Sequence, residues 1–156
     1  MKLSDEIIKE IAESVDLGFT CYVNPETGDM ETMMENNDLG FDLYLDENEI
    51  DEKVIENEPG WQKEVRIEIK EQMARIDSWK HCVVIQKPDS RVAFRFMEGF
   101  VEEIIPEKNK EMYWNALNWK KPFSNFNNLV HNSDYREEWF QFKLEKLIEY
   151  VREELR

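Results

Sequence analysis

The side chains best suited to bind a metal ion in this sequence are Cys21, His81 and Cys82. Cysteine and histidine are natural zinc ligands, and structural sites hold them at short, characteristic spacings. Here His81 and Cys82 are adjacent, and neighbours on a strand point to opposite faces, so the two cannot easily share one ion. The chain has no Cys-x-x-Cys and no His-x-x-x-His pair. We predict that no metal is bound and that both cysteines are small apolar core residues.

The same cysteines could act as nucleophiles, with His131 as the base. No feature of the sequence around Cys21 or Cys82 marks an activated thiol. The chain also lacks a glycine-rich loop that could cradle a phosphate group. We therefore predict no catalytic residues and no cofactor.

Carboxylates are abundant, and Glu98 is the best single candidate for a functional acid. It lies beside Gly99 in a predicted helix, and another predicted helix carries three further acids, Glu64, Glu68 and Glu71. A carboxylate on a helix usually belongs to a solvated face. A carboxylate hydrolase that uses Glu98 is accordingly the third of the three function classes considered.

Acidic residues are concentrated in one segment of the chain. Residues 26–60 hold 13 acidic side chains and one lysine, a net charge of −12, whereas the whole chain carries −15. Four of these acids, Asp42, Asp46, Glu47 and Glu49, lack the glycine and spacing of an EF-hand calcium loop. The near-neutral remainder disfavours attraction to bare DNA or anionic lipid. We interpret the segment as a solvated edge, and as the docking site for a basic protein if such a partner exists.

A second candidate site is the stretch "NWKKPFSNFNNLV", residues 118–130. Trp119 with Lys120 and Lys121 combines a ring with two cations, as a single-strand nucleic-acid binder would. Two other interpretations precede it: a joint between two helices, which we place first, and a surface that binds a partner, which we place second. If the stretch is a joint, Phe123 and Phe126 lie on one face, which packs on the C-terminal helix. The expected contacts are Trp139, Phe142 or Leu147, and both lysines stay in water.

The elements before residue 60 are a helix and a hairpin. Ser4 can cap a helix with an apolar stripe at the 3.6-residue period, and Gly18 can end it. Residues 19–34 form two strands around the turn "NPETGD", in which Gly28 supplies a positive φ. Residues 41–45 alternate apolar with polar side chains, which indicates a further strand.

The later elements are mostly helical. A helix begins near Pro59 and carries the stripe Val65, Ile69, Met73 and Ile76. Residues 81–86 indicate a buried strand. Helices follow over 91–104, 108–119 and 134–156. We expect Ser90 to cap the first of these and Asp134 with Glu137 to form a capping box at the last.

These elements predict a single α+β domain over residues 1–156, with a small antiparallel sheet packed with a mostly helical C-terminal half. The hairpin at 19–34 and the strand at 81–86 form the sheet. The chain lacks an apolar run long enough to span a membrane, and its charged N-terminus is unlike a signal peptide. With two cysteines there is no disulfide framework, so we expect a cytoplasmic protein.

Four motifs in order resemble an uncharacterised bacterial protein family of unknown function, over about residues 18–155. They are "YVNPETGDM", "FRFMEGFVEEI", "ALNWKKPFSNF" and "YREEWFQFK". The resemblance implies a cytoplasmic bacterial protein with an α+β fold, and it implies no activity or site residues. Where the family has a Gly-x-Phe element with basic neighbours, this chain has Pro122, Ser124 and three asparagines. A phosphate site on that element is therefore disfavoured.

The function that the sequence favours is a non-enzymatic adaptor that binds another protein. Its motivation is the absence of a catalytic constellation together with an acidic segment beside an aromatic half. The alternative is a single-stranded nucleic-acid or nucleotide binder that uses Lys120, Lys121 and the neighbouring rings. The oligomeric state stays open.

Overall fold

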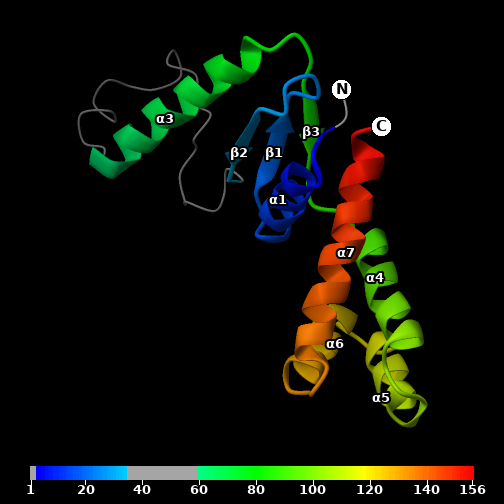
Figure 1. Cartoon of the computed structure of the whole chain (residues 1–156). Coiled ribbons are helices and arrows are strands. Elements are labelled where there is room, and N and C mark those ends of the chain that lie inside the picture. The colour runs from blue at the N-terminus through cyan, green and yellow to red at the C-terminus, as the bar shows by residue number, and fades with distance from the viewer. Residues whose placement is uncertain (1–2, 35–59) are drawn as a thin grey trace. The chain divides into compact units, whose positions relative to one another are not determined.

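The computed structural model describes residues 3–34 and 60–156 (Figure 1). The strand expected at 41–45, the Pro59 helix start and the four acids from Asp42 to Glu49 lie outside these residues. The chain divides into two compact units, one comprising Met1–Lys87 and the other Pro88–Glu154. Each unit is described by itself, and the single domain expected over residues 1–156 stays a prediction.

The first helix, α1 (Asp5–Asp16), begins and ends as expected. The Ser4 hydroxyl accepts a hydrogen bond from the Ile7 backbone N–H at 3.3 Å, which satisfies a donor that the first turn leaves unpaired. The helix ends at Leu17, and Gly18 follows with φ +98°, a conformation that other residues rarely adopt. One apolar face of α1 is buried, through Ile8, Ile11, Ala12 and Val15.

The sheet has three antiparallel strands, β1 (Thr20–Val23), β2 (Met30–Met33) and β3 (Val83–Ile85), in the order β2-β1-β3. The predicted hairpin is confirmed: Thr20 pairs with Met33, and Gly28 in its turn has φ +83°. Cys21 pairs with Ile85 on the other side of β1. β3 is shorter than the buried strand predicted over 81–86, and it is not buried throughout, since Val84 is 45% exposed.

Helix α3 (Gly60–Asp77) follows in the first unit and lies beside β2 (Figure 1). Of the stripe expected on this helix only Ile69 is buried, and Met73 is 43% exposed. Polar contacts join α3 to β2 instead. Arg75 donates to both carboxylate oxygens of Glu31, at 2.5 and 3.2 Å, and Gln72 donates to Glu31 and to the Thr32 carbonyl.

The second unit consists of α4 (Ser90–Glu103), α5 (Glu107–Leu117), α6 (Pro122–His131) and α7 (Arg136–Glu154). Two expected caps are wrong. Asp89 caps α4, since its carboxylate accepts from the Val92 N–H at 3.0 Å, and Ser90 is already helical. α7 begins two residues after Asp134, and it is the Ser133 hydroxyl that accepts from the Tyr135 N–H just before the helix.

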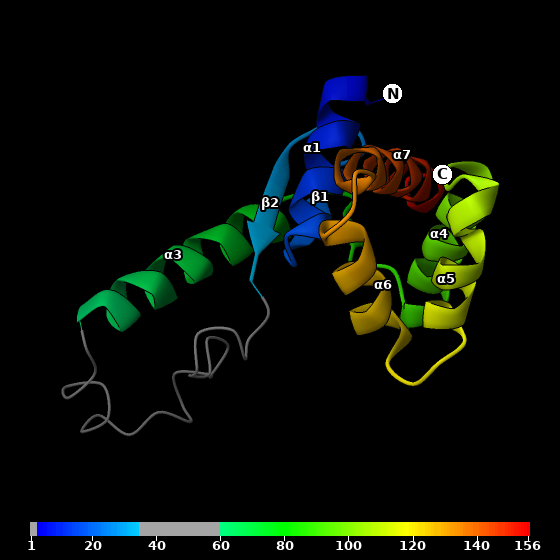
Figure 2. The ribbon, with the colours of Figure 1, turned by 90° about the horizontal axis from the view of Figure 1, so that it is seen from below.

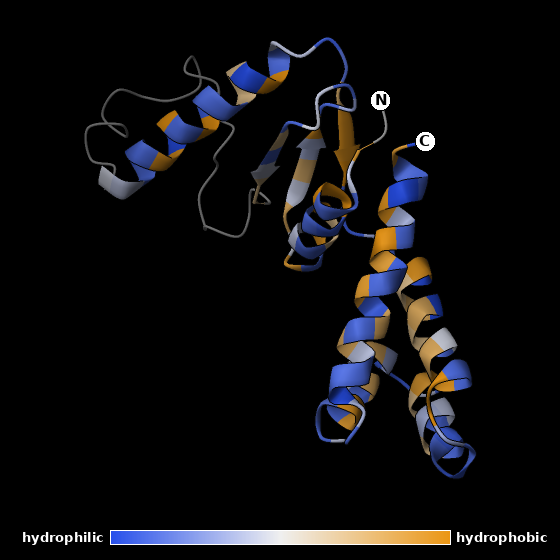
Figure 3. Ribbon diagram, in the orientation of Figure 1, coloured by the Kyte–Doolittle hydropathy of each residue, from blue (hydrophilic) through white to orange (hydrophobic). Residues whose placement is uncertain are grey.

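The four helices surround a common centre (Figure 2) filled by aromatic rings. Phe100 of α4 makes edge-to-face contacts with Phe126, Trp139 and Phe142, with ring centroids 5.2–6.2 Å apart. α4 is hydrophobic along much of its length (Figure 3), as expected for a central helix. The fold is therefore α+β, with a small antiparallel sheet and a mostly helical C-terminal half. Within the described residues no helix is long and apolar enough to cross a membrane.

Candidate functional site

The stretch 118–130 forms a joint between α5 and α7. Phe126 is fully buried, with its ring centroid 4.8 Å from that of Trp139 and 5.9 Å from that of Tyr113. The prediction that Phe126 packs on the C-terminal helix is thus confirmed. The same prediction is wrong for Phe123, which remains 38% exposed. Its ring packs edge-to-face on that of Phe94 in α4, with the ring centroids 6.3 Å apart. Side chains three residues apart on a helix point in directions that differ by about 60° around its axis. This offset is enough for Phe123 and Phe126 to contact different neighbours.

Trp119, Lys120 and Lys121 occupy the short turn between α5 and α6, and all three are exposed. Trp119 is 72% exposed, and both lysines are in water as predicted. Lys121 has a left-handed backbone, with φ 55°. Asn125 closes this turn, because its side-chain amide donates to the carbonyls of Lys120 (2.7 Å) and Ala116 (3.2 Å).

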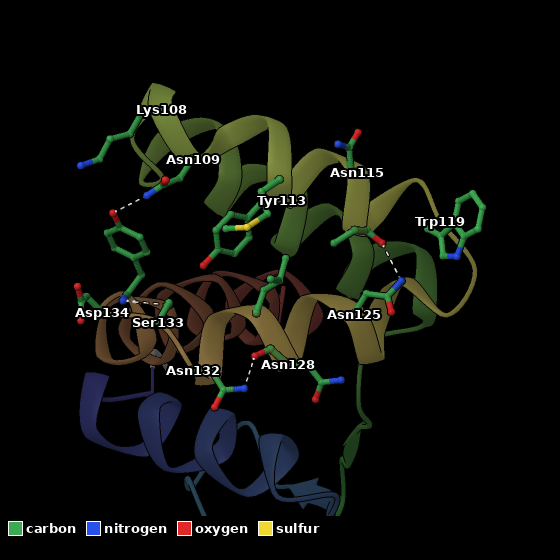
Figure 4. Close-up of a pocket in the computed structure, with 14 residues that line it drawn as sticks. Lys108, Asn109, Tyr113, Asn115, Trp119, Asn125, Asn128, Asn132, Ser133 and Asp134 are labelled. Atoms are coloured by element: carbon green, nitrogen blue, oxygen red, sulfur yellow. Dashed lines mark hydrogen bonds between the residues drawn. The ribbon is translucent and has the colours of Figure 1, made fainter.

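Beside this turn, α5 and α6 enclose a groove of about 1030 Å³ (Figure 4). Its inner surface includes the buried Tyr113 and the half-buried Ala116 and Leu129. At one end the Asn109 amide donates to the Tyr135 hydroxyl at 3.0 Å, which links α5 to the segment before α7. Trp119 stands at the other end. The groove thus combines an apolar interior with one polar end and one aromatic end.

Five asparagines line the groove, and they differ in how far the fold uses them: Asn109, Asn115, Asn125, Asn128 and Asn132. Asn109 and Asn125 hold the fold through the bonds just described. The Asn132 side-chain amide donates to the main-chain carbonyl of Asn128 at 2.8 Å, so the side-chain carbonyl of Asn132 and one of its N–H groups stay available. The side chains of Asn115 and Asn128 are exposed and bond to no other residue in the described part of the chain.

The Tyr113 hydroxyl is the most unusual polar group in the groove. Tyr113 is 1% exposed, and its hydroxyl has no hydrogen-bond partner among the described residues. Figure 4 shows this hydroxyl directed into the space between α5 and α6. Burying a hydroxyl without a partner costs free energy, and most buried polar groups have one. A hydrogen-bond acceptor that enters the groove would supply it.

The charge of the groove is balanced. Lys108 and Asp134 are the charged residues that line it, and they carry opposite signs. Lys120 and Lys121 lie in the adjacent turn and do not line it. The groove therefore suits an uncharged, hydrogen-bonding ligand better than a chain of phosphates.

The residues considered for metal binding and for a thiol nucleophile are not arranged for either. Burial raises the pKa of Cys21 to about 11, and its thiol faces the Ile11 carbonyl at 3.9 Å. Cys82 is exposed, contrary to the expected core position. Neighbouring atoms still desolvate its thiol to some extent, which raises the pKa of Cys82 as well. Both thiols are thus protonated at neutral pH and weak nucleophiles. His81 instead contacts Glu26, at 3.3 Å, and in the described ranges no three His, Cys, Asp or Glu side chains could jointly hold a metal ion.

Glu98 lines a separate hollow of about 370 Å³, beside Arg91, Arg95 and the Phe94–Phe123 ring pair. The acids Glu64, Glu68 and Glu71 are exposed along α3. The positions on α3 are typical of a solvated helix face, whereas Glu98 is half-buried. The acidic candidates from Asp42 to Glu49 lie outside the described residues.

Sequence reasoning named Trp119 as a candidate site residue and named neither Tyr113 nor the groove asparagines as one. One signal was available: Asn125, Asn128 and Asn132 recur at three- and four-residue steps, which places them on one side of a helix. The Tyr113 hydroxyl gave no such signal, because its isolation depends on which side chains surround it.

A model of the uncharacterised protein family UPF0158 matches residues 24–156. No curated protein and no solved structure matches the chain. The family match covers most of the span over which the sequence motifs resemble such a family, including the groove and the aromatic core. The chain therefore belongs to the uncharacterised protein family UPF0158.

Proposed function

We propose that this is a non-enzymatic binding protein that contacts another protein through the α5–α6 groove. The observation that carries the proposal is the groove itself, with an apolar interior, neutral carboxamides along its sides and an exposed Trp119 at one end. Interface cores are depleted in charge and enriched in tryptophan and tyrosine. Tryptophan is also a frequent hot-spot residue, whose truncation weakens a complex by about 2 kcal/mol or more.

The acidic segment is a second part of this proposal. Asp42, Asp46, Glu47 and Glu49 would attract a basic region of the same partner, which would raise the association rate and make it sensitive to salt. Its support is the net charge of −12 over residues 26–60. The bacterial cytoplasm is the proposed setting, supported by the family resemblance and by two cysteines that are both unpaired.

A second candidate function is the binding of single-stranded nucleic acid at Trp119, Lys120 and Lys121. It is favoured by one observation: the exposed ring directly precedes two exposed lysines that form no ion pair within the described residues. Stacking of a base on an aromatic ring contributes about 1–3 kcal/mol. Against it stand the small number of cations and the balanced charge of the groove.

Site-specific photocrosslinking in cells tests the proposal. A benzophenone amino acid in place of the exposed Asn115 reports on the groove, and one in place of the exposed Glu149 of α7 is the control. We expect protein adducts from position 115 that survive nuclease treatment and that decrease when Trp119 is changed to Ala. Adducts that disappear with nuclease, and with Lys120→Glu and Lys121→Glu, would support the second candidate instead. Equal adducts from positions 115 and 149 would contradict the groove as the binding site.

A further inference from the structure

We infer that the groove takes its partner as an extended peptide segment, bound through the peptide main chain by the carboxamides of α6 and through one apolar side chain by the interior of the groove. This inference rests on the proposed function and names the ligand class of the same site. It is carried by the chemistry of the lining side chains, by their spacing and by the buried hydroxyl of Tyr113.

The chemistry of the groove matches a peptide main chain. An asparagine carboxamide offers an N–H donor and a carbonyl acceptor on one edge, so it can form two hydrogen bonds with the N–H and the C=O of one residue in an extended chain. Asn128 is exposed and unpaired within the described residues, and Asn132 keeps a carbonyl and one N–H available. These groups are uncharged, so they bind neutral peptide groups without the cost of burying an ion.

The spacing of the two asparagines also matches an extended chain. Asn128 and Asn132 are four residues apart, so they lie on one side of α6 about 6 Å apart along its axis. An extended peptide repeats its side-chain direction every two residues, a distance of about 6.6 Å. Two carboxamides at this spacing can therefore pair with alternate residues of one extended segment. The intervening residue can then turn its side chain toward the interior, where Leu129 and Ala116 lie.

The Tyr113 hydroxyl supplies an independent observation that points to a ligand. It is a buried donor without a partner among the described residues, and it is directed into the groove. The tyrosine ring packs on Phe126, with centroids 5.9 Å apart, and the hydroxyl oxygen is itself buried, so an acceptor in the groove bonds to it only when the side chains around it move aside. A main-chain carbonyl of the bound segment would satisfy it.

The residues that line the groove also indicate which kind of peptide segment it would bind. Lys108 and Asp134 are of opposite sign, and no net charge lines the groove. We expect a segment that is uncharged at its centre, with one apolar residue for the interior and an aromatic or apolar residue to contact Trp119. Phosphorylated or strongly basic segments fit the groove poorly.

Selection from a random library of twelve-residue peptides displayed on phage, with the full-length chain as bait, tests the inference. We expect enriched peptides with one apolar anchor, neutral neighbours and no helical spacing. N-methylation scanned along a synthetic copy removes one main-chain N–H at a time. It should weaken binding by about threefold to tenfold at alternate residues, the effect of one lost hydrogen bond.

Matched variants of the protein show which of its side chains bind the peptide. Asn128→Ala should weaken the peptide by about threefold to tenfold, whereas Asn127→Ala, on the same helix and outside the groove lining, should leave it unchanged. Tyr113→Phe should also weaken the peptide while the melting temperature stays equal or rises, because the lost hydroxyl has no partner to lose. An affinity unaffected by Tyr113→Phe would show that the hydroxyl contacts no ligand and would overturn that part of the inference.

Three outcomes would overturn the inference as a whole. Enriched peptides with anchors at three- and four-residue steps and no sensitivity to N-methylation would indicate a helix in the groove. If no peptide is enriched while adducts from position 115 still depend on Trp119, the binding role stands and the extended-peptide ligand is wrong. If no peptide is enriched and the adducts from position 115 do not depend on Trp119, the inference and the proposed function are both wrong.

Discussion

Helices α3 and α6 show two ways of attaching a helix to its unit. α3 has 18 residues, of which only Ile69 is buried, and it is joined to β2 by the polar contacts of Gln72 and Arg75. α6 has ten residues and fully buries Phe126 and Val130. In Figure 3, α3 is largely hydrophilic with scattered hydrophobic residues. The apolar area that a helix buries determines its contribution to stability, and its length does not.

The largest expected effect is at the aromatic centre of the second unit. Phe126→Ala should lower the free energy of unfolding by about 3–5 kcal/mol, because it leaves a cavity among Phe100, Tyr113 and Trp139. Chemical denaturation followed by tryptophan fluorescence measures the change. Phe123→Ala is the matched control and should cost clearly less, since Phe123 is 38% exposed. A Phe126→Ala protein as stable as the wild type would contradict the joint and favour the nucleic-acid candidate.

The next effect concerns the one buried side chain of α3. Ile69→Ala should cost about 2 kcal/mol, the low end for a buried isoleucine, because Ile69 keeps 8% of its surface exposed. Ile67→Ala, on the same helix and 54% exposed, should change stability by less than about 0.5 kcal/mol. Circular dichroism during denaturation reports both. Equal effects for the two variants would show that α3 is not held through Ile69.

A smaller effect, dependent on pH, belongs to the polar attachment of α3. Hydrogen bonds from Arg75 lower the pKa of Glu31 below its ordinary value, and the Gln72 amide contributes in the same direction. A lowered pKa means that the contact stabilises the fold above the ordinary glutamate range, and that this stability is lost as pH falls toward the lowered value. Glu31→Gln should therefore cost at most about 1 kcal/mol at pH 7, because Arg75 is half exposed.

The difference between wild type and Glu31→Gln should shrink as the pH falls from the ordinary glutamate range through the lowered pKa. Denaturation at a series of pH values measures it. The free energy of unfolding that Phe126→Ala removes should be nearly constant over the same pH range, because the neighbours of Phe126 are aromatic rings. A Glu31→Gln deficit that does not change with pH would show that the contact acts through shape and not through charge.

The smallest effect is expected in the exposed turn. Lys120→Ala and Lys121→Ala should each change stability by less than about 0.5 kcal/mol, because both side chains are in water. Thermal melts of the double variant measure this. A larger loss would mean that the cations stabilise the joint, and weakened binding of an oligonucleotide would favour the second candidate function.

The elements were predictable where their signals are local. Ser4 and Gly18 bound α1 as expected, and Gly28 marks the hairpin turn, because capping and positive φ depend on a few neighbouring residues. The α4 cap was misplaced by one residue, since Asp89 and Ser90 are both good caps and only the backbone path decides between them. The stripe on α3 was a good helix signal but a poor guide to burial, because burial needs a partner surface.

Composition and periodicity alone determined the α+β class, the joint at Phe126 and the exposure of Lys120 and Lys121, since each follows from residue type and helical spacing. The tertiary structure alone decided that Phe123 contacts α4, that Cys82 is exposed and that the asparagines of α6 face a groove beside α5. The same asparagines on an isolated helix would form an ordinary solvated face. They become a candidate site because a second helix, α5, lies next to them and carries the buried Tyr113 hydroxyl, and such proximity leaves no trace in local sequence patterns.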